Sequence, residues 1–221
     1  MRPTPEAYAE LEKAYDYFNR HLFEGALPPC ILTLHRKKRT FGYFAHQAFL
    51  HRSGATTDEI AMNPEHFNKP IRETLQTLVH EMCHLWQAHL GKPGRARYHN
   101  KEWGDKMESI GLMASNTGAP GGKKTGDQMM DYVIEGGRFE GIANKLLTEH
   151  FTISWMDRFQ VLQEEQGGSA EGTEGETKPK PNKSNRLKYR CPTCEAQVWG
   201  KPNLQVRCGK CPEGSFFEVV D

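Results

Sequence analysis

Residues 70–90 read PIRETLQTLVHEMCHLWQAHL, and this stretch decides the fold of the chain. Its apolar side chains recur at three- and four-residue steps, the spacing of one buried face of an amphipathic helix: Leu75, Val79, Met82 and Trp86. Pro70 suits the first turn of a helix, and Gly91 with Pro93 marks its end. We therefore predict a helix over residues 70–90.

The centre of this predicted helix carries an HExxH motif, His80-Glu81-Met82-Cys83-His84. Because an α-helix turns once in about 3.6 residues, His80 and His84 project from one face, where their imidazoles can hold one Zn²⁺. Glu81 lies beside them and can accept a proton as general base without being a metal ligand. The motif predicts a hydrolase that uses zinc-activated water, and a chance occurrence of the spacing is the alternative.

A catalytic zinc site usually has three protein ligands, so a third must come from elsewhere in the fold. Four candidates follow the motif: His89, His99, Glu102 and Asp105. His89 lies five residues beyond His84, which turns it away from the metal face of the helix. We favour His99, which follows a chain-reversing turn and begins a predicted helix at 100–112, although a surface or cap histidine is the alternative. The other histidines have no partner at ligand spacing and are expected to face solvent or to bond locally: His21, His35, His46, His51, His66 and His150.

The flanking sequence predicts an α+β domain. Residues 5–22 have the apolar spacing of a helix. Residues 30–52 alternate apolar and polar side chains around a basic turn, and residues 59–63 follow, which predicts two or three strands of a small antiparallel sheet. Turn-forming residues at 115–128 predict a loop, and residues 132–165 a strand, a turn and some helix.

The composition is that of an ordinary globular protein, with 37% hydrophobic and 26% charged residues in a chain of 221. This length accommodates one main core and a small appendage. The formal net charge of +1 does not argue for a nucleic-acid or membrane partner. The N-terminal residues carry scattered charges and no apolar run spans a membrane, so we expect a soluble, cytoplasmic protein without a membrane partner. The oligomeric state is unknown from the sequence.

Two C-x2-C pairs, Cys191/Cys194 and Cys208/Cys211, lie thirteen residues apart near the end of the chain. This is close to the spacing of four-cysteine structural zinc sites. The short segment between them is β-like, so we predict a small β zinc ribbon at 188–221 whose folding energy comes from the metal. Redox-active cysteine pairs are the alternative.

Residues 166–187 contain almost no apolar side chains and are rich in Gly, Ser, Glu, Thr, Pro and Lys. Such a composition cannot bury enough surface to offset the entropy of ordering, so it predicts a flexible linker. The predicted domains are therefore 1–165, with 113–165 a poorly assigned insert or extension, and the ribbon at 188–221.

Two basic clusters are candidates for nucleic-acid contact. The first cluster consists of the basic residues between Lys178 and Arg190, with Tyr189 among them and Trp199 following. Basic side chains beside aromatic ones suit contact with phosphates and stacking on single-stranded DNA. A solvated linker is the alternative for this cluster. The second cluster, HRKKR at 35–39, is also explained by a charged hairpin tip.

Residues 80–112, HEMCHLWQAHLGKPGRARYHNKEWGDKMESIGL, resemble the SprT-like metalloprotease family, whose eukaryotic relative Spartan cleaves proteins crosslinked to DNA. In that family the HExxH helix is followed by a short loop and a third histidine in an H-G-x-E-F-like segment, which residues 99–103 (HNKEW) match at the His, Glu and aromatic positions. Residues 15–35 resemble the family's opening helix and first strand, and many members carry a similar C-terminal ribbon. Asn100 in place of the usual Gly, and the insert at 113–165, depart from the pattern.

The resemblance implies a zincin-like domain with Glu81 as catalytic base and Glu102 in a structural or supporting role. It implies one catalytic zinc ion at three histidines and, with the ribbon, one structural zinc ion at four cysteines: His80, His84 and His99; Cys191, Cys194, Cys208 and Cys211. The expected substrate is a protein, including DNA-bound or DNA-crosslinked protein. The alternative is a nucleic-acid-binding or transcription-associated zinc adaptor with little or no hydrolytic activity, which Glu81→Gln would leave functional.

Overall fold

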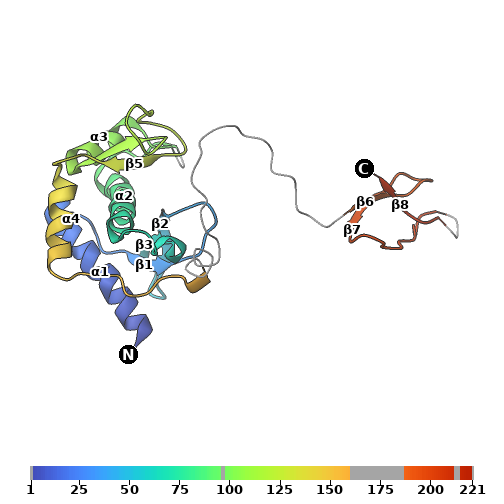
Figure 1. Cartoon of the computed structure of the whole chain (residues 1–221), viewed down its shortest axis with the longest axis horizontal. Helices are drawn as coiled ribbons and strands as arrows, with labels where there is room; N and C mark the ends of the chain where they lie inside the picture. The colour runs from blue at the N-terminus through green and yellow to red at the C-terminus, as the bar shows by residue number, and fades with distance from the viewer. Residues whose placement is uncertain (1, 96–97, 160–186, 212–214, 221) are drawn as a thin grey trace. The chain divides into compact units, whose positions relative to one another are not determined.

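The computed structural model describes residues 2–95, 98–159, 187–211 and 215–220. Contacts divide the chain between Ala170 and Glu171 into two compact units, and each unit is described by itself (Figure 1). All of the predicted linker at 166–187 except Leu187 lies outside the described residues. The domain boundaries predicted from the sequence therefore stay predictions.

Four α-helices occur in the described part of the first unit: α1 (Pro3–Leu22), α2 (Ile71–Leu90), α3 (Lys101–Ile110) and α4 (Arg138–Thr148). A short 3-10 helix, η1 (Pro64–His66), precedes α2. The first three helices agree with the helices predicted at 5–22, 70–90 and 100–112, although α3 ends at Ile110 and Leu112 begins a strand. Pro70 precedes the first turn of α2 and Gly91 caps its end, as the two residue types favour.

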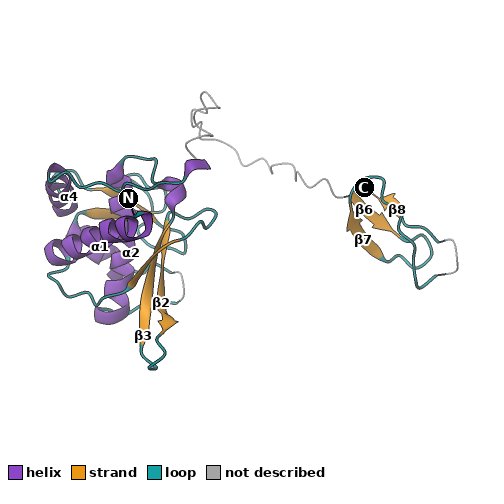
Figure 2. Cartoon of the chain, turned by 90° about the horizontal axis from the view of Figure 1, so that it is seen from below, coloured by secondary structure: helices purple, strands orange, loops and turns teal. Residues whose placement is uncertain are grey.

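The larger sheet is three-stranded, with the order β1-β3-β2: β1 (Ile31–Leu34), β2 (Gly42–Leu50) and β3 (Thr56–Met62). β2 and β3 form the expected antiparallel pair, whereas β1 pairs with β3 in parallel. The basic cluster at 35–39 therefore connects two strands that do not pair with each other, and it is not a hairpin tip. The hairpin turn lies between Leu50 and Thr56 instead, where β2 and β3 run side by side (Figure 2).

The described part of the poorly assigned segment, residues 113–159, belongs to the first unit. β4 (Leu112–Ser115) and β5 (Met130–Val133) form a two-stranded antiparallel sheet, and α4 follows. The Gln76 side chain of α2 donates to the Asp131 carbonyl at 2.9 Å, which ties β5 to α2. The α+β fold class is confirmed, with this small sheet as part of the domain.

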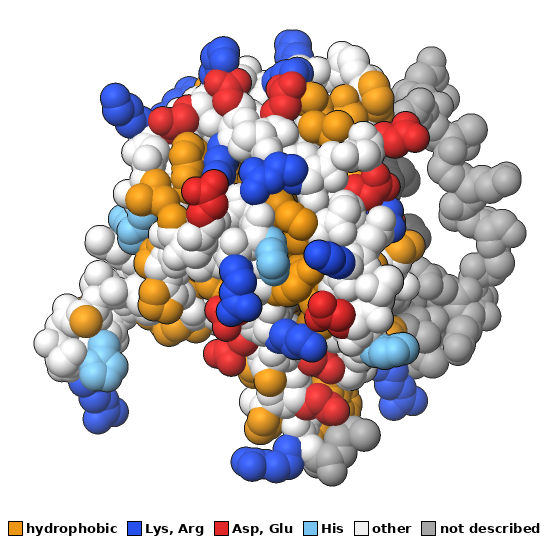
Figure 3. Space-filling view, turned by 90° about the vertical axis from the view of Figure 1, so that its left-hand side faces the viewer, with side chains coloured by type: hydrophobic (Ala, Val, Ile, Leu, Met, Phe, Trp, Pro, Cys, Tyr) orange, Lys and Arg blue, Asp and Glu red, His pale blue; other side chains and the backbone are white. Residues whose placement is uncertain are grey.

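The core of the first unit lies between the four helices and the larger sheet. On α2, Leu75, Val79 and Met82 are fully buried, as their spacing predicts. Phe18 of α1 stacks on Phe139 of α4 with ring centroids 5.8 Å apart, and both side chains are fully buried, so α1 and α4 pack against each other in the core. Each such side chain contributes about 1.5–3 kcal/mol when fully buried. Charges of both signs are interspersed over the face of the first unit that Figure 3 shows, without a large region of one sign.

The second unit is a three-stranded antiparallel sheet with the order β7-β6-β8: β6 (Leu187–Arg190), β7 (Gln197–Gly200) and β8 (Glu218–Val220). Tyr189 of the central strand is almost fully buried, and its hydroxyl donates to the Lys201 carbonyl at 2.6 Å. One cysteine pair, Cys191/Cys194, lies between β6 and β7, and the other, Cys208/Cys211, lies between β7 and β8. In the described parts of both units, no helix is long and apolar enough to cross a membrane.

Candidate metal centre

Three histidines predicted from the sequence lie together at the middle of α2. His80 and His84 are one turn apart on this helix, with ring centroids 5.3 Å apart. His99, which precedes α3, brings its Nε2 atom to 3.1 Å from Nε2 of His84. One nitrogen from each of the three rings lies within 4.8 Å of the others, so the group fits a single metal ion.

The turn between α2 and α3 explains why His99 returns to α2. The Glu102 carboxylate accepts the backbone N–H of Lys92 at 2.6 Å and the Gln87 amide at 2.9 Å, which fastens the start of α3 to the end of α2. Asn100 caps α3, because its side-chain oxygen accepts the backbone N–H of Trp103 at 3.0 Å. Asn100, the residue that departs from the family pattern, thus has a structural role of its own.

Trp103 lies against all three histidine rings. Its ring stacks on His84 at 5.1 Å between centroids and meets His80 and His99 edge to face at 4.9 and 4.5 Å. The indole is fully buried, and its N–H has no hydrogen-bond partner among the described residues. The rings therefore rest on a rigid aromatic support that limits their rotation.

Two residues of the poorly assigned segment orient the histidines, and neither was among the predicted site residues. Nδ1 of His80 donates to the Asp131 carboxylate at 2.8 Å, and Nδ1 of His99 donates to the Gly126 carbonyl at 3.0 Å. With Nδ1 so engaged, Nε2 is the nitrogen of each ring that can bind a metal. Neither residue has a spacing signal, since Asp131 lies 51 positions from His80 and reaches it only through the pairing of β4 with β5.

Glu81 is buried beside the histidines, with 6% of its surface exposed. Burial raises the pKa of its carboxyl to about 7, against the opposing charge of His80. The start of β2 packs over it, because a Cβ atom added to Gly42 would lie 3.3 Å from Cγ of Glu81. A carboxyl group with a pKa near neutral can both accept and release a proton at physiological pH.

The charges of the histidines also suit metal binding. Burial and the neighbouring His80 and His99 hold the pKa of His84 well below its usual value. Burial would lower the pKa of His80 too, but the bond to Asp131 and the charge of Glu81 outweigh it and raise this pKa. A neutral His84 has the lone pair that a metal ligand needs.

The remaining candidates lie elsewhere. His89 points away from the three histidines, as its five-residue offset predicts, and its Nε2 atom bonds to Asp58. Asp105 is exposed and pairs with Lys101. Neither belongs to the centre formed by His80, His84 and His99.

The four cysteines of the second unit also come together. The sulfur of Cys191 lies 3.8 Å from that of Cys211, and the sulfur of Cys194 lies 3.5 Å from that of Cys208. Ligand atoms of a tetrahedral zinc site with Zn–S bonds of about 2.3 Å are separated by roughly 3.8 Å. Backbone N–H groups of Cys194 and Thr193 outweigh burial and lower the pKa of Cys191 to about 6, whereas burial and the neighbouring cysteine sulfurs raise the pKa of Cys211 to about 12. The cluster therefore fits a zinc ion.

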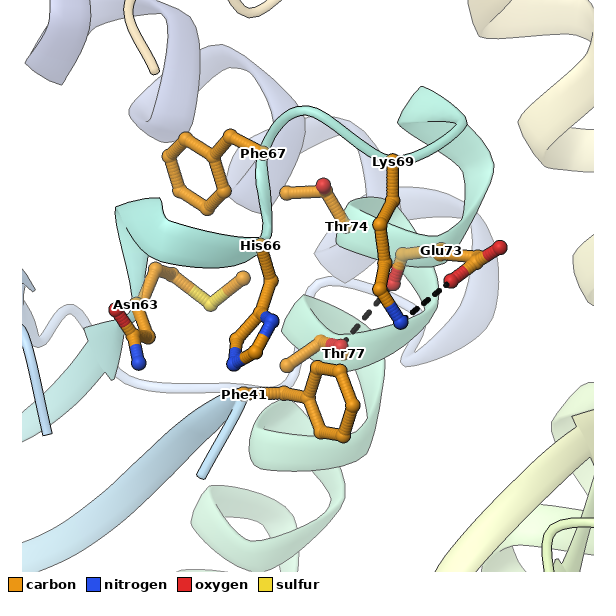
Figure 4. Close-up of a pocket in the computed structure, with 9 residues that line it drawn as sticks. Phe41, Asn63, His66, Phe67, Lys69, Glu73, Thr74 and Thr77 are labelled. Atoms are coloured by element: carbon orange, nitrogen blue, oxygen red, sulfur yellow. Dashed lines mark hydrogen bonds and ion pairs between the residues drawn. The ribbon is translucent and has the colours of Figure 1, made fainter. Parts of the chain in front are cut away.

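A shallow pocket near the start of α2 is separate from both clusters (Figure 4). The rings of His66 and Phe41 stand beside each other at its mouth, with centroids 4.3 Å apart. The Lys69 ammonium is held 3.5 Å from the Glu73 carboxylate at its rim. None of the predicted metal-site residues lines this pocket.

Comparisons with known proteins agree with this geometry. Residues 11–122 match the model of the SprT-like family, a range that includes α2, His99 and α3. A Salmonella typhimurium protein described as an uncharacterized protein in the mucB 3' region is 58% identical over 59 residues, which cover 26% of this chain and 80% of that protein. No solved structure matches the chain. Since the family match spans half of the chain, the protein belongs to the SprT-like family, and this membership supports a function of the metalloprotease type.

Proposed function

We propose that this protein is a zinc-dependent peptidase whose zinc ligands are His80, His84 and His99. The observation that carries the proposal is the convergence of three imidazoles beside one buried carboxyl group, that of Glu81. A set of three histidines leaves a coordination position open, as catalytic zinc sites do. The bonds from His80 to Asp131 and from His99 to Gly126 are the outer contacts that orient such ligands.

The roles of the protein groups follow from their positions. A bound Zn²⁺ would lower the pKa of a water molecule and polarise the carbonyl group of the scissile peptide bond. Glu81 would accept the proton of the attacking water and pass it to the leaving nitrogen. Asp131, Gly126 and Trp103 would keep the imidazoles in place during the reaction.

The edge of the larger sheet supports a peptide substrate. Among the described strands, β2 pairs only with β3, so its other edge is available to an added strand. The start of β2 lies over Glu81, and the ring of Phe44 is nearly parallel to that of His84, with centroids 6.4 Å apart. An extended peptide that pairs with this edge would pass beside the three histidines. The site therefore suits an extended protein substrate.

The Glu81→Gln variant tests the activity. We expect it to keep wild-type zinc content and to lose at least about 100-fold in the rate of casein cleavage, measured with and without single-stranded DNA. Glu73→Gln is the matched control, because Glu73 is an exposed glutamate on the same helix. Zinc-loaded wild type that cleaves nothing under either condition would favour the alternative, a zinc adaptor without hydrolytic activity.

We also propose that the second unit binds a structural zinc ion at its four cysteines and contacts single-stranded DNA. Trp199 is 62% exposed, and Lys188, opposite it on the neighbouring strand, has its Nζ 5.9 Å from the centre of the indole. A second pair has Arg207 over the ring of Phe216 at 5.4 Å. Exposed aromatic rings with adjacent cations suit stacking on bases and contact with phosphates. The basic residues 178–186 lie outside the described residues.

DNA contact would make DNA-bound and DNA-crosslinked proteins the natural substrates, in the cytoplasm where cysteine thiolates stay reduced. We expect Trp199→Ala to weaken binding of a labelled single-stranded oligonucleotide by about 1–3 kcal/mol. Leu187→Ala, at a part-exposed apolar residue on the neighbouring strand, is the control. Equal affinity of wild type and Trp199→Ala would remove this part of the proposal.

A further inference from the structure

A second cluster of histidines lies at the last turn of α2, apart from the three-histidine centre. The Asp58 carboxylate of β3 is contacted by Nδ1 of His46, from β2, at 2.8 Å and by Nε2 of His89, from α2, at 2.5 Å. The two histidines contact different oxygens of the same carboxylate, and their ring centroids are 5.6 Å apart. The side chain of His46 is 48% exposed, in agreement with the expectation that it faces solvent. The fold also joins it to residues 12 and 43 positions away in the chain, which its spacing did not predict.

An irregularity of β2 builds this cluster. The register of β2 with β3 shifts between Ala45 and Phe49, and Gln47 has a positive φ of 49°. The backbone N–H of Gln47 donates to the side-chain carboxylate of Asp58, on β3, at 2.7 Å. Such bulges re-aim side chains and are common next to functional sites. Here the bulge places His46 against Asp58.

Asp58 is a buried carboxylate without a permanently charged partner. Only 3% of its surface is exposed, and its ion-pair partners among the described residues are the two histidines. A buried carboxylate is unfavourable unless it is paired with a cation or bound to a metal. Neutral histidines compensate its charge only in part, so the carboxylate would gain from a bound cation.

We propose that His46, Asp58 and His89 bind a divalent transition-metal ion of the Zn²⁺ type, at a site separate from the three-histidine centre. Two imidazoles and one carboxylate form a donor set that suits zinc and its neighbours in the series. Their ligand atoms lie within 4.8 Å of one another. Ligand atoms about 2.0 Å from a tetrahedral ion are separated by roughly 3.3 Å, so small side-chain rotations open the present contacts enough to admit it.

The exposure of the two histidines gives the ion a way in. The side chain of His46 is 48% exposed and that of His89 35%, whereas that of Asp58 is buried. On binding, the ion would take the lone pair of the imidazole nitrogen that faces the carboxylate. A proton on that nitrogen would move to the other nitrogen of the ring or to solvent, and water would fill the remaining coordination positions. The ion would join β2, β3 and the end of α2 at one point, next to Phe44, whose ring lies 6.4 Å from both His46 and His84.

The test counts zinc ions in the full chain. Wild type, His46→Gln, His89→Gln and Asp58→Asn are dialysed against micromolar Zn²⁺, and bound zinc is measured per chain. We expect each of the three variants to hold one zinc ion fewer than wild type. His51→Gln is the control, because His51 follows the same strand but bonds to Ser53 at 2.7 Å. It should hold as much zinc as wild type.

Two outcomes would overturn the proposal: equal zinc content in wild type, His46→Gln and His89→Gln, or a difference that appears only at millimolar Zn²⁺. If Asp58→Asn fails to fold, as judged by circular dichroism, the half-exposed His46 decides the question. The test is independent of the proposed peptidase, because it compares ion counts between variants that leave Glu81 and its three histidines intact.

Discussion

Asp131 offers the sharpest test of how the three-histidine centre is held. Its carboxylate accepts the Nδ1–H of His80 at 2.8 Å, and its side chain is only 7% exposed. The Gln76 amide bonds to the same carboxylate at 2.8 Å and also to the Asp131 backbone, so truncation leaves the amide one partner. We therefore expect Asp131→Ala to fold and to act mainly through His80.

The size of the effect follows from the type of bond. A hydrogen bond to a charged group contributes about 1.5–3 kcal/mol, and a neutral one about 0.5–1.5 kcal/mol. Asp131→Ala removes the charged bond and should weaken zinc binding at the histidines by about 10- to 100-fold, the range observed when such outer contacts are lost. Asp131→Asn keeps an oxygen acceptor, so it should weaken zinc binding by only about 5-fold, which corresponds to about 1 kcal/mol.

Zinc affinity would be measured by competition with a chromophoric chelator in the full chain, where the cysteine site serves as an internal reference. Asp127→Asn is the matched control, because Asp127 lies in the same segment but pairs with the exposed Arg95. Wild-type affinity in Asp131→Ala would refute the idea that this carboxylate fixes His80. An equal loss in the Asn and Ala variants would show that charge, and not geometry, is what Asp131 supplies.

Three further predictions concern other parts of the chain. Gly42→Ala should lower the free energy of unfolding by about 1–3 kcal/mol and reduce cleavage, because the added Cβ would lie 2.9 Å from a backbone oxygen beside the site. Gly141→Ala is the control: a Cβ added at this helical position meets nothing within 4 Å, so it should raise thermal stability slightly. The bond from Arg36 holds the pKa of Asp157 below its usual value. The stability that Asp157 contributes is therefore present at neutral pH and is lost as the pH falls below about 3.9 and through the lowered pKa. Urea unfolding should give wild type and Asp157→Asn the same free energy of unfolding once the pH is below this lowered pKa. Cys194→Ser should remove one zinc ion and the protection of the ribbon amides from hydrogen exchange, while zinc at the histidines stays bound.

Local patterns in the sequence were sufficient for those parts of the site that one helix or one turn determines. The spacing of His80 and His84 on α2 predicts a shared face because helical geometry alone decides it. The C-x2-C pairs are equally local, and their sulfurs meet as the spacing suggests. His99 was favoured because it follows a chain-reversing turn and begins a predicted helix, and the family resemblance implies the same residue.

What depends on pairing between distant strands could not be predicted. Asp131 reaches His80 because β5 pairs with β4, and no pattern in the sequence indicates that these two strands pair. The hairpin expected at 35–39 does not form, because β3 lies between β1 and β2 in the sheet and pairs with β1 in parallel. The bulge that turns His46 toward Asp58 is a register shift, which alternation of polar and apolar residues does not encode.

The spacing of histidines along α2 separates the two metal sites that we propose. His84 lies four residues after His80 and shares its face, while His89 lies five residues after His84 and is rotated from it by about 140°. One rigid helix therefore presents imidazoles to two different places, and β2 touches both through Phe44 and His46. If this separation holds, His84→Gln should abolish zinc binding at the three-histidine centre without changing the ion held by His46 and Asp58. Loss of both ions in that variant would mean that the two clusters form a single cooperative site.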